Sequence, residues 1–259
     1  MSDLLFEARD GIGYITFNRP QARNALTFAM YERLIEVVAE AEADAAIKVL
    51  VLSGAGDKAF AAGTDINQFR AFKTPQDALD YEARIDRVLG QLERCRLPTI
   101  AAIAGACTGG GAGIAACCDL RIGAGNAKFG FPIARTLGNC LSTTNYARLS
   151  ALIGPSRVKE LIFLARLVEA EEAKAIGLLH EVVSEPAQLM PRATEIARTV
   201  AGHAPLTLRA TKEVLRRLRD RAAVADEDKE LLLMCYMSSD FREGMDAFLN
   251  KRQPVWQGK

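Results

Sequence analysis

Two short loops made almost entirely of small residues are the segments in which backbone groups could do chemistry. Residues 61–66 read AAGTDI, and residues 105–113 read GACTGGGAG. Each loop lies between an apolar run typical of a buried strand and a segment with helical character. The start of a helix leaves N–H groups without partners, and glycine lets another molecule approach the backbone closely. One such loop could hold an anion, and two on neighbouring strands could direct two N–H donors at one oxygen, as in an oxyanion hole.

The same glycines allow two other interpretations. They could serve only the tight packing of a strand against a helix. Residues 111–116 also fit the dinucleotide-binding pattern G-x-G-x-x-A, which needs an acidic residue about twenty positions further on. No Asp or Glu lies between Asp119 and Glu160, so the sequence disfavours a nicotinamide cofactor.

The overall composition favours a globular protein without a strongly charged partner. The 259 residues are 49% apolar and 25% charged, with a net charge of +1, which disfavours nucleic acid as a partner. The six cysteines show no disulfide or C-x-x-C spacing, and there are only two histidines. We therefore expect free thiols and no metal site. The N-terminal residues do not resemble a signal peptide, which predicts a cytoplasmic protein.

One uncharged stretch, residues 97–118, approaches the length of a membrane span. It contains Pro98, five glycines and mostly small side chains, which gain little from lipid. We expect this stretch to form a tightly packed strand, loop and helix in a soluble core, with no membrane as a partner.

The order of the predicted elements indicates the α/β class. Strands are expected at residues 12–17, 49–52, 99–104, 120–122 and 128–131, and helices at about 28–43, 75–95 and 114–118. After residue 142 the pattern is almost wholly helical, with expected helices at about 157–165, 171–175, 206–218, 225–237 and 239–251 and a brief strand at 180–183. The stripe Leu208, Thr211, Leu215 and Leu218 should face another surface. We divide the chain into a core, residues 1–195, and a C-terminal helical oligomerisation region, residues 196–259.

The chain resembles the crotonase family, also called the enoyl-CoA hydratase/isomerase family, over nearly its whole length. The matching segments are short, but they occur in the family's order and at its spacing. They are residues 18–20, 24–26, 59–66, 98–105, 109–111, 118–122, 129–130, 173, 176–178, 243–245, 247–248 and 251–252.

The resemblance implies a fold, a substrate class and a set of site residues. The fold would be a spiral of ββα turns with a helical C-terminal region that builds homotrimers, often paired as hexamers. The substrate would be an acyl-CoA thioester, so that coenzyme A is part of the substrate and no separate cofactor is expected. The oxyanion hole would use the N–H groups of Thr64 and Gly110.

The resemblance also assigns the substrate-binding surface. Adenine would lie against the loop around Ala62, which continues into Asp65 and Ile66. The 3′-phosphoadenosine end would meet basic groups, for which Arg23 and Lys251 of a neighbouring subunit are the candidates. A solvated surface charge is the alternative for each of these two side chains, and a structural role at a helix start is the alternative for Asp65.

The chain departs from the family where hydratases carry two glutamates. The first position is Gly113, and the second falls on Ile133 or Ala134, so neither can ionise. Adding water across a conjugated double bond needs a base for the water and an acid for the α-carbon. The chain therefore keeps the part that stabilises an enolate and lacks the recognised proton-transfer part. Decarboxylation, isomerisation or hydrolysis with a base from elsewhere, and acyl-CoA binding without catalysis, stay open.

Residues 135–140 occupy the family's active-site wall and offer other polar groups. Arg135 could pair with a substrate carboxylate. Asn139 could hold a water or a polar acyl group, and we count it with the catalytic candidates. Cys140 could be a nucleophile, although no histidine lies near it in the sequence. Tyr81 and Glu82, on the helix after the first loop, could also point inward, although packing or solvation is the simpler interpretation for each of these side chains.

Overall fold

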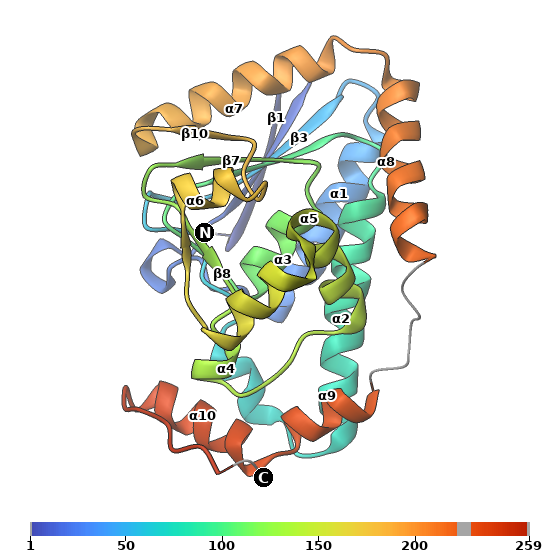
Figure 1. The fold of residues 1–259 in the computed structure, drawn as a ribbon. Helices are drawn as coiled ribbons and strands as arrows, with labels where there is room; N and C mark the ends of the chain where they lie inside the picture. Colours follow the sequence, from blue (N-terminus) through green and yellow to red (C-terminus); the bar gives the residue numbers. More distant parts are fainter. Residues whose placement is uncertain (1, 222–228, 258–259) are drawn as a thin grey trace.

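The computed structural model describes residues 2–221 and 229–257 and shows a mixed α/β fold with two sheets (Figure 1). The larger sheet has the strand order β1-β2-β3-β5-β7-β10. β1 and β2 form an antiparallel hairpin, and the other neighbouring pairs are parallel. The strands are β1 (Leu4–Arg9), β2 (Ile12–Phe17), β3 (Val49–Gly54), β5 (Thr99–Ile103), β7 (Leu120–Ala124) and β10 (Glu181–Val183).

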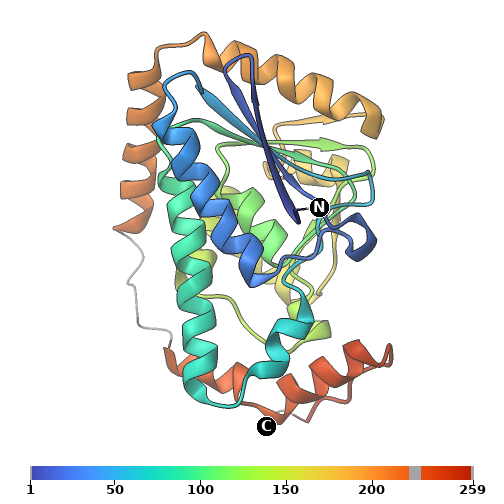
Figure 2. The ribbon, with the colours of Figure 1, turned by 180° about the vertical axis from the view of Figure 1, so that it is seen from behind.

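Helices cover both faces of this sheet and bury its central strands. α7 (Pro186–Ala201) packs its buried side chains against one face. α1 (Phe28–Ala43) and α2 (Pro75–Arg94) lie on the opposite side (Figure 2). β3 and β5 read as continuous apolar runs because parallel strands between two helical layers have no solvent-facing side. α7 runs through residue 195, and the division of the chain at that residue stays a prediction.

The smaller sheet positions the two glycine-rich loops. Its strands are β4 (Ala59–Ala61), β6 (Ala106–Thr108), β8 (Lys128–Gly130) and β9 (Val168–Glu169), and β4 pairs in parallel with β6. The loop after β4 leads into the 3₁₀ helix η2 (Ile66–Ala71), and the loop after β6 leads into α3 (Gly110–Cys117). The two loops therefore follow neighbouring parallel strands, and each precedes a helical segment.

Several predicted boundaries were wrong, and some elements were not predicted. No strand was expected at β1, β4, β6 or β9, and no helix at α7. β6 is only three small residues long within the predicted glycine-rich connection. α3 begins at Gly110, four residues before the predicted start. α5 (Thr143–Phe163) begins well before the predicted helix at 157, because Gly154, at φ +75, joins two helical pieces across a kink before Pro155.

The C-terminal helices are α8 (Pro205–Asp220), α9 (Lys229–Tyr236) and α10 (Ser239–Leu249). Residues 222–228, which include the start of the helix predicted at 225–237, lie outside the described residues. α8 is anchored by Lys212 Nζ, which lies 2.6 Å from Asp119 Oδ2, and by Arg219, which pairs with Glu93 of α2. α9 and α10 lie at the end of the molecule farthest from α7 (Figure 1).

α8 leaves an apolar stripe on the surface of the single chain. Four of its apolar side chains are more than half exposed: Leu206 (76%), Val214 (54%), Leu215 (63%) and Leu218 (57%). Leu208 is partly buried and Thr211 is exposed. The predicted stripe is therefore not covered by the described part of its own chain.

Residues 97–118 lie in the interior as β5, β6 and α3 rather than in a membrane span. None of the helices within residues 2–221 and 229–257 is both long enough and apolar enough to cross a bilayer.

Candidate functional site

The two glycine-rich loops touch each other at the ends of β4 and β6. Gly63 (φ +97) and Gly109 (φ +51) both adopt left-handed backbone conformations, which disfavour other residues. A Cβ atom on Gly109 would lie 3.4 Å from the Cα atom of Gly63, and one on Gly63 would lie 4.0 Å from the amide nitrogen of Gly110. The loops can approach this closely because neither carries a side chain at the contact.

Each loop presents an amide group without an acceptor among the described residues. Gly110 is the first residue of α3, where an N–H group has no intrahelical partner. In the first loop, the backbone groups of the residues on either side of Thr64 form hydrogen bonds with Leu26. Leu26 N donates to Gly63 O, and Asp65 N donates to Leu26 O, both at 2.8 Å. Neither Thr64 N nor Gly110 N donates to another residue within the described chain. Two unused N–H donors on touching loops can bind one oxygen that carries negative charge.

Two tyrosines hold the side chain of Thr64. Its Oγ1 atom lies 2.9 Å from the hydroxyl of Tyr31 on α1 and 3.0 Å from the hydroxyl of Tyr81 on α2. The Tyr31 hydroxyl also borders the second loop, because a Cβ atom on Gly110 would lie only 2.0 Å from it. Tyr31 therefore braces both loops and leaves room only for glycine at position 110.

Both phenols remain protonated at neutral pH. Burial raises the pKa of Tyr31 and of Tyr81 well above its usual value, and the negative charge of Glu82 raises both further. The sequence did not identify Tyr31, because a tyrosine on the apolar face of a predicted helix is typical of a packing residue.

A second polar chain extends from Glu82 to Asn139. Glu82 is buried, with 6% exposure. The Tyr236 hydroxyl donates a short hydrogen bond to its Oε1 atom, and Asn139 Nδ2 donates to the Tyr236 oxygen at 3.1 Å. The inward direction expected as one possibility for Tyr81 and Glu82 is therefore observed. No feature of the sequence indicated Tyr236, which is distant along the chain.

Aromatic side chains surround this polar chain. The Tyr236 ring centroid lies 6.0 Å from that of Tyr81 and 4.9 Å from that of Phe241. Phe69 contacts Tyr81 and Phe241 at centroid distances of 4.9 and 5.9 Å, and Phe72 contacts Tyr236 at 6.3 Å. The tyrosine hydroxyls, Glu82 and Asn139 are thus set in an otherwise apolar cluster.

The first-loop candidates have structural partners. Asp65 Oδ2 accepts from Arg19 Nη1 at 3.0 Å, and Asp65 Oδ1 accepts from the backbone N–H of Asn67 at 3.1 Å. Although burial raises the pKa of Asp65, these hydrogen bonds outweigh it and keep the pKa below its usual value. Asp65 therefore caps η2 as an ionised group, in line with its structural interpretation. Ala62 and Ile66 flank it and are partly buried.

The predicted basic groups are exposed. Arg23 lies next to the first loop, because its carbonyl oxygen accepts from Ala62 N at 3.1 Å. Arg135 is on α4 (Ile133–Thr136), and Lys251 follows α10 with a left-handed backbone. Their roles toward a substrate stay predictions.

The three positions discussed for the glutamates differ in surroundings. Gly113 is buried in α3, where a Cβ atom would lie 3.2 Å from Leu89 Cδ1. Ile133 is buried, with 6% exposure, and Ala134 is exposed. None of the three side chains can exchange a proton.

Cys140 has a thiol neighbour that the sequence did not indicate. A hydrogen bond with Cys140 lowers the pKa of Cys235, on α9, to about 7. Burial instead raises the pKa of Cys95 to about 11 and that of Cys117 to about 12. Cys235 is therefore the thiol most readily ionised near neutral pH among those compared.

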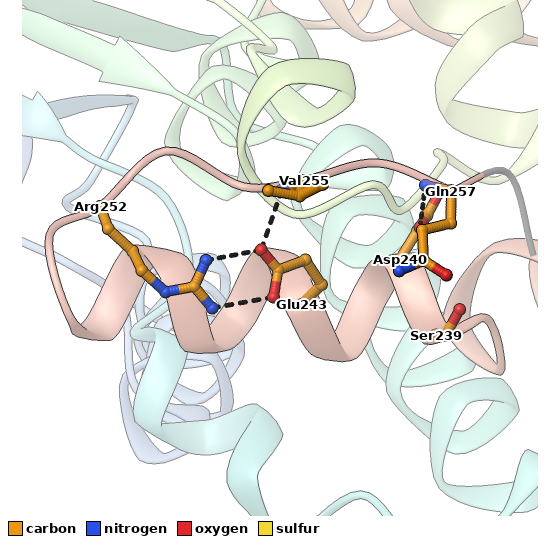
Figure 3. A pocket seen from close by; sticks show the side chains of 6 residues that line it. All are labelled: Ser239, Asp240, Glu243, Arg252, Val255 and Gln257. Carbon is orange, nitrogen blue, oxygen red and sulfur yellow. Dashed lines mark hydrogen bonds and ion pairs between the residues drawn. The ribbon is translucent and has the colours of Figure 1, made fainter.

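A separate hollow lies at the C-terminal end, where the chain after α10 folds back on that helix (Figure 3). Arg252 pairs with Glu243 at 2.6 Å, and the backbone N–H groups of Val255 and Gln257 donate to Glu243 and Asp240 at 2.8 and 2.7 Å. These polar groups hold the tail on the helix, so we assign them no ligand. Within the described chain, no group of three or more His, Cys, Asp or Glu side chains could hold a metal ion.

Comparisons with known proteins identify the family to which the chain belongs. The family model described as enoyl-CoA hydratase/isomerase matches residues 7–259. The short-chain-enoyl-CoA hydratase of Clostridium acetobutylicum is 34% identical over 255 residues, covering 98% of this chain and 97% of that protein. A crystal structure of an enoyl-CoA hydratase/carnithine racemase from Magnetospirillum magneticum has a TM-score of 0.81 and 33% identity, covering 100% of this chain and 97% of that one.

A further solved structure extends the range of chemistry among the neighbours. A methylmalonyl-CoA decarboxylase in complex with 2-nitronate-propionyl-CoA has a TM-score of 0.90 and 27% identity, covering 100% of this chain and 99% of that one. The match of the family model over nearly the whole chain, together with these likenesses in sequence and fold, establishes that the chain is a member of the enoyl-CoA hydratase/isomerase, or crotonase, family of acyl-CoA enzymes.

Proposed function

We propose that the chain binds an acyl-CoA thioester with its carbonyl oxygen between Thr64 N–H and Gly110 N–H and stabilises the enolate that forms there. The observation that supports this assignment is the pair of touching loops whose two amides have no acceptor within the described residues. One such donor typically contributes about 10²–10³ in kcat when negative charge develops on the oxygen. The Thr64 hydroxyl, fixed between two phenols, holds the first loop in the conformation that presents its amide.

The reaction we favour is an isomerase- or lyase-type conversion through an enolate, rather than hydration, with any base that it needs supplied from a position other than those of the two glutamates. Gly113, Ile133 and Ala134 carry no group that can activate water or protonate the α-carbon. Positioned acid and base groups contribute about 10²–10⁴ in rate, so their loss leaves the oxyanion contribution but not the hydratase reaction.

Decarboxylation is the second candidate, and the likeness to the solved methylmalonyl-CoA decarboxylase favours it. In a 2-carboxyacyl thioester, the bond to the carboxylate carbon breaks and CO₂ leaves. The electron pair moves to the thioester as an enolate, whose oxygen the two amides would stabilise. A proton donor then supplies the α-proton, so this reaction needs no base to start it. Arg135 could pair with the carboxylate of such a substrate.

The remaining substrate contacts are proposed from family likeness. Adenine would lie along Ala62, with Asp65 and Ile66 nearby, and the 3′-phosphate would meet Arg23 and Lys251 of a neighbouring subunit. Arg23 supports this placement because its backbone is bonded to Ala62. Coenzyme A would enter and leave as part of the substrate. The six free cysteines support a reducing compartment such as the cytoplasm.

We also propose that the chain forms a homotrimer or a dimer of trimers. The exposed apolar side chains of α8 support an interface, because isolated apolar residues are common on surfaces but a run along one helix is not.

Substrate specificity can be tested with a panel of thioesters. Crotonyl-CoA hydration should be at least about 10²-fold slower than that of a family hydratase assayed in parallel, because two proton-transfer groups are lacking. An enoyl-CoA with a shifted double bond, or methylmalonyl-CoA, should give product. Chromatography of the thioesters measures that product. Fast hydration of crotonyl-CoA would contradict the proposed reaction, and tight binding of every thioester without any product would indicate a non-catalytic binder.

The oxyanion assignment can be tested by a double-mutant cycle at Gly110 and Tyr31. Gly110→Ala should lower kcat on an active thioester by about 10²-fold, because its Cβ atom would collide with the Tyr31 hydroxyl and displace the amide. In a Tyr31→Phe background the same change should cost much less, since the colliding oxygen is gone. The carbonyl stretching frequency of bound butanoyl-CoA gives a second readout. Full activity and an unchanged frequency in Gly110→Ala would exclude this placement of the thioester.

The thiol alternative can be tested through the pH dependence of alkylation. Iodoacetamide should label Cys235 first, with a rate that rises through about pH 7 as the thiolate forms, as followed by mass spectrometry. A Cys235→Ser variant is the control. Cys140→Ser should reduce turnover less than Asn139→Ala, and the reverse order would point to a mechanism that uses the thiol.

Association can be tested by the mass in solution. Light scattering should give three or six times the 28.1 kDa of one chain. The double variant Leu215→Glu and Leu218→Glu should shift the mass toward that of one chain. Leu5→Glu, at a 43% exposed position of the core outside α8, should not. A wild-type protein with the mass of one chain at micromolar concentration would contradict the assembly.

A further inference from the structure

A buried acceptor beside the aromatic cluster has no hydrogen-bond partner within the described part of the chain. Asn139 Oδ1 is inaccessible to solvent and receives no hydrogen bond from the described residues. Buried polar atoms in native proteins are nearly always paired, and an exception calls for a ligand, a water or a functional explanation. The Asn139 oxygen is therefore a candidate contact for a bound molecule.

The neighbouring hydrogen bonds fix which end of the Asn139 amide is presented. Tyr236 has one O–H group, and it donates this to Glu82. Toward Asn139 it can offer only a lone pair, so Asn139 must turn Nδ2 toward Tyr236, as observed at 3.1 Å. The Oδ1 atom is consequently the free end, and a molecule that binds it must bring a donor.

A chain of contacts through Tyr81 and Tyr236 connects this acceptor to Thr64. Two residues before Thr64, the backbone N–H of Ala62 donates a hydrogen bond to the carbonyl oxygen of Arg23. Through its side chain, Thr64 contacts Tyr81, whose ring packs against that of Tyr236. A thioester with its adenine end toward Arg23 and its carbonyl at Thr64 would extend its acyl end toward this aromatic cluster.

The surroundings make the acceptor selective. Phe69, Phe72 and Phe241 supply aromatic rings around Tyr81 and Tyr236. A polar acceptor in an apolar wall discriminates strongly, because a ligand without a matching donor leaves it unpaired.

We propose that Asn139 Oδ1 accepts a hydrogen bond from an O–H group at the acyl end of the bound thioester, either a hydroxyl of the acyl chain or a water held beside it. This inference rests on the proposed function, because it uses the placement of the thioester carbonyl at Thr64 and Gly110. Asn139 contacts the substrate or its water, and Tyr236 and Glu82 act as positioning residues that set the polarity of its amide.

The test compares the dissociation constants of butanoyl-CoA and 3-hydroxybutanoyl-CoA by calorimetry. If the substrate hydroxyl is the donor, the wild type should bind the hydroxylated thioester more tightly by about tenfold, the factor that corresponds to one hydrogen bond. Asn139→Leu should abolish that preference and leave butanoyl-CoA binding nearly unchanged. If water is the donor, Asn139→Leu should weaken both thioesters equally. Asn250→Leu, the same change at an exposed asparagine, should alter neither.

Tyr236→Phe provides a second test that keeps the ring in place. Without the phenol oxygen the Asn139 amide loses its anchor, so the effect of Asn139→Leu should be largely reproduced. Unaltered affinities in both Asn139→Leu and Tyr236→Phe would overturn this inference while leaving the acyl-CoA site intact. Failure of wild-type protein to bind either thioester would instead overturn the proposed function, and this inference with it.

Discussion

The close contact between two backbone loops is the constraint on which the proposed site depends. The parallel pairing of β4 with β6 places the loops side by side, and the absence of side chains at Gly63 and Gly109 lets them meet. Each loop then leaves one amide, that of Thr64 and that of Gly110, without an acceptor among the described residues. A backbone N–H without an acceptor is costly when it is buried, so a folded protein keeps such groups where solvent or a ligand can supply the acceptor. Two of them together favour an oxygen that carries charge.

The side chains around the loops give this arrangement rigidity. Tyr31 and Tyr81 come from two different helices and meet at the hydroxyl of Thr64. Helices hold side chains more precisely than loops do, so this junction transfers the rigidity of α1 and α2 to a loop residue. The burial of the phenols, together with the charge of Glu82, raises the pKa of both groups and keeps them protonated and able to donate. Glu82 itself accepts the hydrogen bond of the Tyr236 hydroxyl, which directs the hydrogen bonds between Tyr236 and Asn139.

Membership of the crotonase family indicates the class of substrate, whereas the side chains around the site decide the type of reaction. The family match covers residues 7–259, and the relatives include a protein named as a hydratase. A neighbour in fold is a decarboxylase, which shows that one scaffold can carry more than one acyl-CoA reaction. The polar chain of Glu82, Tyr236 and Asn139 comes from α2, α9 and the segment after α4. Reaction type is thus a question about the groups beside the scaffold rather than about the scaffold.

The sequence alone indicated the fold class through the alternation of strands and helices, and the family through its resemblance to the crotonase motifs. It also located the two loops, because small residues between an apolar run and a helix leave few other structures. It also predicted α1 at 28–43 and α2 within one residue, since each has a long amphipathic pattern. Only the tertiary structure showed that Tyr31 borders Gly110 and that Tyr236 joins Glu82 to Asn139. Tyr236 and Asn139 are 97 positions apart in the sequence. Such contacts join side chains from distant elements, and each of these tyrosines also suits an apolar helix face. Periodicity reports which face of a helix is buried, whereas the packing of helices decides which atoms meet.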